Sequence, residues 1–176
     1  MQALGGKEGN AARALRFAVL TAARGGEVRG MRWRDLDLDA RVWAVPAERM
    51  KARRTHLVPL SRAALAVLAE MRGQARGPDA HVFPGARGAA PLSDMALSRL
   101  VRGMCSDGLP EDAPPRRRDA EGDAVVPHGL RSTFRDRAGE TRPEGRRWWR
   151  LPWHTPSRTT RRPPTRGPTC WGGGAR

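Results

Sequence analysis

Residues 21–33 read TAARGGEVRGMRW, and this stretch gives the clearest indication of how the chain folds. Helical residues run into Gly25-Gly26, and a glycine pair of this kind commonly ends a helix. Arg24 stands just before the pair, so its side chain would be held at a defined point, and Glu27 is near enough to pair with it. An isolated arginine of this kind is more often an ordinary surface residue. The neighbouring segments therefore decide whether Arg24 has a function.

A helix is predicted before this stretch and a small sheet after it. Asn10 can cap a helix in which apolar residues recur at helical spacing. Those residues are Leu15, Ala18, Val19 and Ala22. Three short runs with β character follow at residues 35–39, 41–45 and 55–60. They predict a three-stranded antiparallel sheet.

Helices are predicted again in the second half of the chain. Ser61 and Ser93 can each cap a helix with one apolar face. The two faces consist of Ala64, Leu65, Leu68 and Met71, and of Leu97, Leu100, Val101 and Met104. Residues 73–91 are rich in Gly, Ala and Pro and indicate a loop, and the charged, aperiodic segment 108–123 indicates a flexible one. Helical character resumes at residues 128–140.

Lys51 is one of only two lysines among 33 basic residues. It lies in a polar turn between the second and third β runs, where a solvated lysine is the simpler interpretation. Lysine is nonetheless a better general acid than arginine, because its pKa falls readily beside other cations. Lys51 is therefore a candidate proton donor.

Residues 127–134 read PHGLRSTF and place His128 and Arg131 on one helical face. An H-x-x-R pair alone is common by chance. Metal-free cleavage of a phosphodiester needs cations on the non-bridging oxygens, an in-line nucleophile and a proton donor for the leaving oxygen. Arginine suits the first task, since its planar fork bonds two phosphate oxygens and keeps its charge.

In this order, over residues 11–140, these segments resemble the catalytic domain of tyrosine site-specific recombinases, the phage integrase family, and in particular prophage-type integrases. The stretch at 21–33 resembles the family motif T-x-x-R-x-G-E-V-x-x-L-x-W. The resemblance implies a mainly α fold with a small three-stranded antiparallel β-sheet, of the DNA breaking-rejoining enzyme type, here incomplete. It implies that Arg24 and Arg131 clamp phosphate and that Lys51 protonates the leaving 5′ oxygen. His128 would bind phosphate and assist as base or donor, with no metal and no cofactor.

The family nucleophile is missing, because the 176 residues contain no tyrosine. The family pattern requires a second histidine or tryptophan downstream of Arg131, followed by a tyrosine. His154 and Thr165 stand near the expected positions, but neither local sequence resembles the family. We interpret His154 as a bystander in a proline-rich tail and expect Thr165 to be no substitute for tyrosine.

The composition changes near residue 144. Residues 145–176 contain eight Arg, four of the six Trp and five Pro, with no acidic residue and Leu151 as the only aliphatic larger than alanine. Such a segment cannot bury enough apolar surface to offset its chain entropy. Read in a shifted register, codons 151–160 can encode an integrase-like segment with a histidine, and a codon near 165 can encode tyrosine. We predict a truncated, frameshifted domain; an Arg/Trp-rich nucleic-acid arm is the alternative.

Three regions are expected: a disordered N-terminus (1–10), a partial catalytic domain (11–143) and a disordered tail (144–176). The separate N-terminal core-binding domain of intact relatives is expected to be absent. Cys105 and Cys170 show no metal-binding spacing and are predicted to be free thiols in a reducing compartment. No signal peptide or membrane span is visible, so a cytoplasmic location is expected.

The net charge of +15 at pH 7 favours a polyanionic partner, nucleic acid ahead of membrane. A GC-rich coding sequence that enriches arginine generally is the alternative. The sequence as a whole predicts a fragment that binds double-stranded DNA, with other recombinase protomers as candidate partners. The family reaction, cleavage and rejoining through a 3′-phosphotyrosine in DNA integration and recombination, is expected to be lost. The alternatives are a non-catalytic DNA-binding protein and an unfolded pseudogene product.

Overall fold

The computed structural model describes residues 2–50, 53–86, 88, 90–110, 113–119 and 122–141. Lys51 falls outside these ranges, as do His154, Thr165 and Cys170. The disordered tail and the roles of these residues therefore stay predictions.

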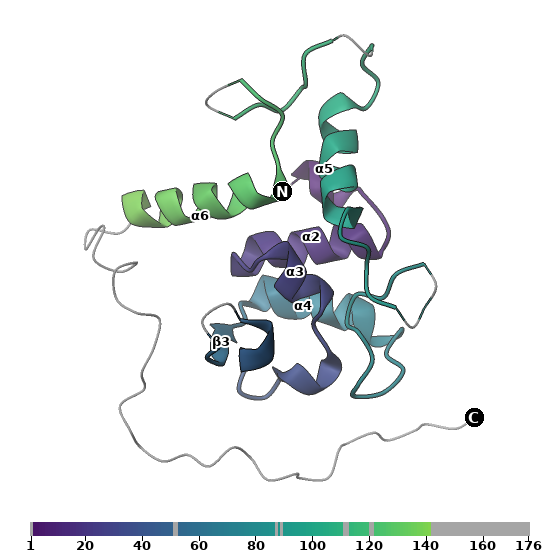
Figure 1. Cartoon of the computed structure of the whole chain (residues 1–176), viewed down its shortest axis with the longest axis vertical. Helices are drawn as coiled ribbons and strands as arrows, with labels where there is room; N and C mark the ends of the chain where they lie inside the picture. The colour runs from purple at the N-terminus through teal and green to yellow at the C-terminus, as the bar shows by residue number, and fades with distance from the viewer. Residues whose placement is uncertain are drawn as a thin grey trace.

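Helix α2 is the central helix, and the small sheet lies below the helices in the view of Figure 1. Helix α2 contacts α1, α3, α4, α5 and α6. The elements in chain order are α1 (Gln2–Gly5), α2 (Asn10–Thr21), α3 (Gly25–Arg29), the 3₁₀ turn η1 (Trp33–Asp35), β1 (Leu36–Asp37), β2 (Val42–Val45), the 3₁₀ turn η2 (Ala47–Arg49), β3 (His56–Pro59), α4 (Arg62–Arg72), α5 (Ala96–Ser106) and α6 (Pro127–Thr141). In the described part of the chain, no helix combines the length and the apolar character needed to cross a bilayer.

The sheet is three-stranded and antiparallel in the order β1-β2-β3, as predicted. In its register Trp43 faces Val58, and Val45 faces His56. All three strands are shorter than predicted. The Asp37 side chain accepts a hydrogen bond from the Ala40 amide at 2.8 Å. Arg41 has φ 55°. A tight turn therefore takes up the residues between β1 and β2.

The core joins the sheet to α2 through aromatic rings. Phe17, fully buried on α2, lies 5.7 Å from the ring of Trp43 on β2 and 5.7 Å from that of Phe83. Phe83 belongs to the predicted loop at 73–91, which folds against the body of the protein: Arg32 and His81 form an isolated antiparallel bridge. Burying each of these rings stabilises the fold by roughly 1.5–3 kcal/mol.

Two predicted helix caps differ from the observed ones, and one is confirmed. Ser61 caps α4, with its hydroxyl accepting a hydrogen bond from the Ala64 amide at 3.2 Å. Asn10 is instead the first residue of α2; Gly9 takes the cap position, and the Asn10 amide group donates to the Pro84 oxygen at 2.9 Å. Ser93 is likewise not a cap. Its main-chain oxygen accepts from the Ala96 amide in a turn, and α5 begins only at Ala96.

The glycine pair also behaves differently from the prediction. Gly25 and Gly26 open α3 and do not end α2. The earlier helix ends at Thr21, where Ala22 adopts a left-handed conformation with φ 52°. Ala22 therefore takes the role expected of glycine.

The prediction of a disordered N-terminus is wrong for Gln2–Gly5. These residues form α1, and Leu4 is only 6% exposed. Lys7 then pairs with Asp107 at the end of α5, at 2.9 Å, and its ammonium group holds the pKa of that carboxyl below the usual range. Cys105 is a free, buried thiol, as predicted. The predicted helix at 128–140 is confirmed as α6.

Candidate nucleic-acid interface

Arg24 occupies the N-cap position of α3 and donates two hydrogen bonds to the Glu27 carboxylate. The main-chain amide of Arg24 donates to Glu27 Oε2 at 3.0 Å, and the guanidinium Nη1 donates to Oε1 at 2.7 Å. The Glu27 side chain is 7% exposed, whereas that of Arg24 is 53% exposed. One carboxylate thus caps the helix and orients the arginine, whose remaining donors face solvent.

Arg131 reaches the same connection between α2 and α3 from the other end of the chain. Its Nη1 donates to the main-chain oxygen of Ala22 at 2.9 Å. Carbonyl groups in the last turn of a helix lack partners within the helix, so a cation there is favourable. The fold therefore places Arg24 and the guanidinium group of Arg131 at one short segment, and their role as a phosphate clamp stays a prediction.

His128 lies exposed in the first turn of α6, on the same helical face as Arg131. Lys51 lies outside the described residues, so only its flanks can be placed: Arg49 ends η2, and Arg53 follows in the hairpin turn with φ 48°. Two of the four predicted site residues are thus brought together, a third is adjacent in α6, and the position of the fourth stays a prediction.

A small hollow lies between α2, α5 and α6 beside this site. Its walls include Leu15, Ala18, Val19, Leu97, Leu130 and Arg131. The lining is apolar apart from Arg131, so the hollow reflects the packing of α6 and offers few polar partners to a ligand. No group of three His, Cys, Asp or Glu residues in the described part of the chain could hold a metal ion.

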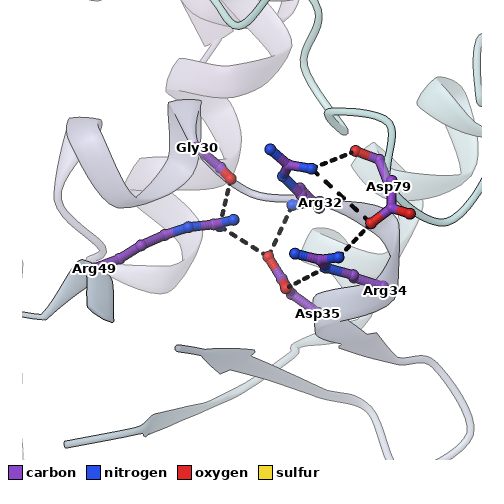
Figure 2. A network of polar contacts seen from close by, with 6 residues as sticks. All are labelled: Gly30, Arg32, Arg34, Asp35, Arg49 and Asp79. Carbon is purple, nitrogen blue, oxygen red and sulfur yellow. Dashed lines mark hydrogen bonds and ion pairs between the residues drawn. The ribbon is translucent and has the colours of Figure 1, made fainter. Parts of the chain in front are cut away.

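Sequence reasoning missed a polar network on the other side of α3 (Figure 2). Its centre is Asp35, whose side chain is only 5% exposed. The carboxylate accepts from the Arg32 amide at 3.0 Å and from Arg49 Nη1 at 2.9 Å. Arg49 also donates to the main-chain oxygen of Gly30, the C-cap of α3. The available signal was weak, since Asp35 is the first of three aspartates at alternate positions (35, 37 and 39) and directly follows Arg34.

Several described arginines, besides Arg24, pair with nearby carboxylates. Ion pairs join Arg13 and Arg16 to Glu70, Arg29 to Asp94, Arg32 and Arg34 to Asp79, and Arg49 to Asp35. Arg53 and Arg54 are exposed and pair with no carboxylate of the described residues. The hairpin turn is thus one of several places where exposed cations are available to an external anion.

Comparison with known proteins gives consistent matches. A model of the phage integrase family matches residues 6–138. Prophage integrase IntZ of Escherichia coli (strain K12) is 42% identical over 88 residues, which are 50% of this chain and 22% of that protein. The integrase of Enterobacteria phage P4 is 30% identical over 141 residues, which are 73% of this chain and 29% of that protein.

A solved structure of the Tn1549 transposon integrase, in complex with a circular intermediate DNA, superimposes with a TM-score of 0.54 at 18% identity. The match covers 73% of this chain and 46% of that one. At this identity the likeness concerns the fold, and it agrees with the mainly helical fold and small antiparallel sheet predicted from the sequence. The chain thus spans less than a third of the two curated relatives and less than half of the solved structure.

Proposed function

Since the chain belongs to the phage integrase family, we propose that it binds double-stranded DNA through the phosphate backbone, as a catalytic-domain segment of a prophage-type tyrosine recombinase. The observation that carries this proposal is the hydrogen bond of Arg131 to Ala22 O, two residues before Arg24 in the connection between α2 and α3. Two guanidinium groups held near one point of the backbone suit one phosphate group. We place this activity in the cytoplasm, in DNA integration and recombination, with other recombinase protomers as candidate partners.

We propose a role for each of the four candidate site residues. Arg24 and Arg131 clamp the non-bridging oxygens, because guanidinium groups stay charged and present two parallel donors. His128 would donate a third hydrogen bond or exchange a proton from the same helix as Arg131. Lys51 would protonate the leaving 5′ oxygen. The arrangement needs no metal and no cofactor, because the cations neutralise the charge that develops on the phosphate.

The proposed activity is binding without strand cleavage. Cleavage in this family requires a tyrosine hydroxyl to attack phosphorus, which forms a 3′-phosphotyrosine and releases the 5′ oxygen. The 176 residues contain no tyrosine. A polypeptide of this sequence would therefore occupy DNA, or join an assembly of intact relatives, without breaking the strand.

Fluorescence anisotropy with a labelled duplex tests this proposal. Arg24→Ala should weaken binding more than Arg72→Ala, a control of equal charge at an exposed position at the end of α4. The difference is expected because Arg24 is held in place by Glu27, and an oriented guanidinium loses less freedom on binding. Equal effects of the two substitutions would show that only net charge matters and would remove the assigned site.

A further inference from the structure

The buried carboxylate of Asp35 ties together two segments that the proposed interface uses. On one side is Gly30, the C-cap of α3, which is the helix whose N-cap is Arg24. On the other is Arg49, at the base of the hairpin turn between β2 and β3. Arg49 Nη1 bonds both Gly30 O and Asp35 Oδ2, so a single guanidinium group joins the helix to the hairpin (Figure 2).

The strength of this junction follows from its burial. Asp35 is 5% exposed and Arg49 is 27% exposed. A carboxylate removed from water needs compensating donors, and loss of one partner leaves the charge uncompensated. Asp35 has two such donors, the Arg32 amide at 3.0 Å and Arg49 Nη1 at 2.9 Å. The hairpin base is therefore held more firmly than an exposed ion pair would hold it.

The turn that follows is maintained by short-range contacts. The Met50 amide donates to Ala47 O at 3.1 Å, and the Arg53 amide donates to Met50 O at 2.9 Å. Arg53 and Arg54 are exposed at this turn and have no carboxylate partner in the described part of the chain. Two exposed arginines therefore lie at a turn whose base is fixed by a buried ion pair.

We propose that Asp35 and Arg49 are positioning residues that fix the hairpin turn relative to α3, so that Arg53 and Arg54 meet the backbone of the same duplex that Arg24 contacts. This inference rests on the proposed DNA binding. Asp35 itself touches no ligand; it acts through Arg49 and the turn. The duplex is therefore gripped at two places whose spacing the Asp35–Arg49 pair determines.

The electrostatic effect and the positioning effect of Asp35→Asn are expected to change the affinity for DNA in opposite directions. Asp35→Asn removes a negative charge, so long-range electrostatics alone would strengthen binding to DNA. If Asp35 fixes the turn, the same substitution loosens the turn and weakens binding. Asp79→Asn is the matched control, since Asp79 also pairs with network arginines but is 68% exposed. It changes the charge equally and leaves the junction at Arg49 in place.

The DNA test compares these two variants by duplex anisotropy, at a temperature where circular dichroism shows both to be folded. We expect Asp35→Asn to weaken affinity roughly 2- to 10-fold, in the range of couplings within one polar network, while Asp79→Asn does not weaken it. The Arg53→Ala/Arg54→Ala background separates positioning from general instability. In that background Asp35→Asn should change the affinity for DNA little. A purely structural defect would instead lower the affinity by the same factor as in the protein that retains Arg53 and Arg54.

Hydrogen exchange of the free protein gives a readout that does not depend on DNA. The amides of Met50 and Arg53 should exchange faster in Asp35→Asn than in Asp79→Asn. The Leu60 amide, bonded to Arg41 O at 2.8 Å at the far end of the hairpin, is the internal reference and should change little. Faster exchange at the turn without any DNA binding by the unsubstituted protein would retain the positioning role and reject the proposed function. Equal exchange in the two variants, or equal affinities, would overturn the inference.

Discussion

Arg131 Nη1 donates a hydrogen bond to the main-chain oxygen of Ala22 at 2.9 Å, across 109 residues of sequence. The bond attaches α6 to the end of α2, where Ala22 has the left-handed φ of 52°. The same arginine that we propose to grip phosphate therefore also helps to dock its own helix. Arg131 thus already has Ala22 O as a hydrogen-bond partner. A DNA phosphate near this point would either replace that hydrogen bond or bind Arg131 in addition to it.

Substitution of Ala22 tests the strain at this junction. Ala22→Gly should raise the free energy of unfolding by about 0.5–1 kcal/mol, because a left-handed conformation costs a residue with a Cβ about 1–2 kcal/mol and glycine much less. Ala18→Gly, in the interior of α2, is the control and should lower it by about 1 kcal/mol. Urea denaturation measures both. Equal destabilisation by the two glycines would show that Ala22 is not strained.

The aromatic contact between α2 and the sheet should dominate stability. Phe17→Ala should lower the free energy of unfolding by about 3–5 kcal/mol, since it leaves a cavity beside Trp43 and Phe83. Phe134→Ala removes an equal side chain that is 47% exposed on α6 and should change stability far less. Thermal unfolding followed by circular dichroism distinguishes them. A small effect of Phe17→Ala would place the core elsewhere.

Much of the fold follows from the sequence because its signals are local. The sheet follows from the three β runs, and the Ser61 cap of α4 from one hydroxyl at the correct position. The Ser93 cap failed because a turn with Ala96 delays the start of α5. The spacing of apolar residues and the presence of a capping residue do not predict whether such a turn or the helix itself forms at a given residue.

The candidate site was less completely predictable. Arg24 and Arg131 were predicted because each belongs to a recognisable motif. Asp35 and Arg49 were not, because their pairing joins segments that only the folded chain brings together, and burial is what gives the pair its importance. Long-range polar contacts of this kind leave no periodic signal in the sequence.

No covalent adduct with DNA should form. A suicide substrate that traps the 3′-phosphotyrosine of an active recombinase should yield no protein–DNA band on a denaturing gel, because the 176 residues contain no tyrosine. A serine or threonine hydroxyl is far less acidic than a phenol and is a poor substitute without an activating base. An active tyrosine recombinase tested with its own site is the positive control. A covalent band from this chain would contradict the proposed loss of cleavage.

The gene should show a shifted reading frame near codon 145. Nucleotide sequencing of codons 140–176 and of the region downstream should reveal, in a shifted register, a histidine codon and then a tyrosine codon near position 165. The expectation rests on the abrupt change of composition and on the codons that the tail permits. A stop codon before that tyrosine in the shifted register, or no tyrosine codon there, would reject the frameshift.

The salt dependence of DNA binding tests the central claim most directly. Each phosphate neutralised contributes roughly −0.9 to the slope of log affinity against log salt concentration. Arg24→Ala/Arg131→Ala should therefore make the slope less negative by roughly 0.9–1.8, for one or two lost contacts, while Arg72→Ala leaves it unchanged. A slope that is the same for the unsubstituted protein, the double variant and the control would show that the two arginines do not contact phosphate.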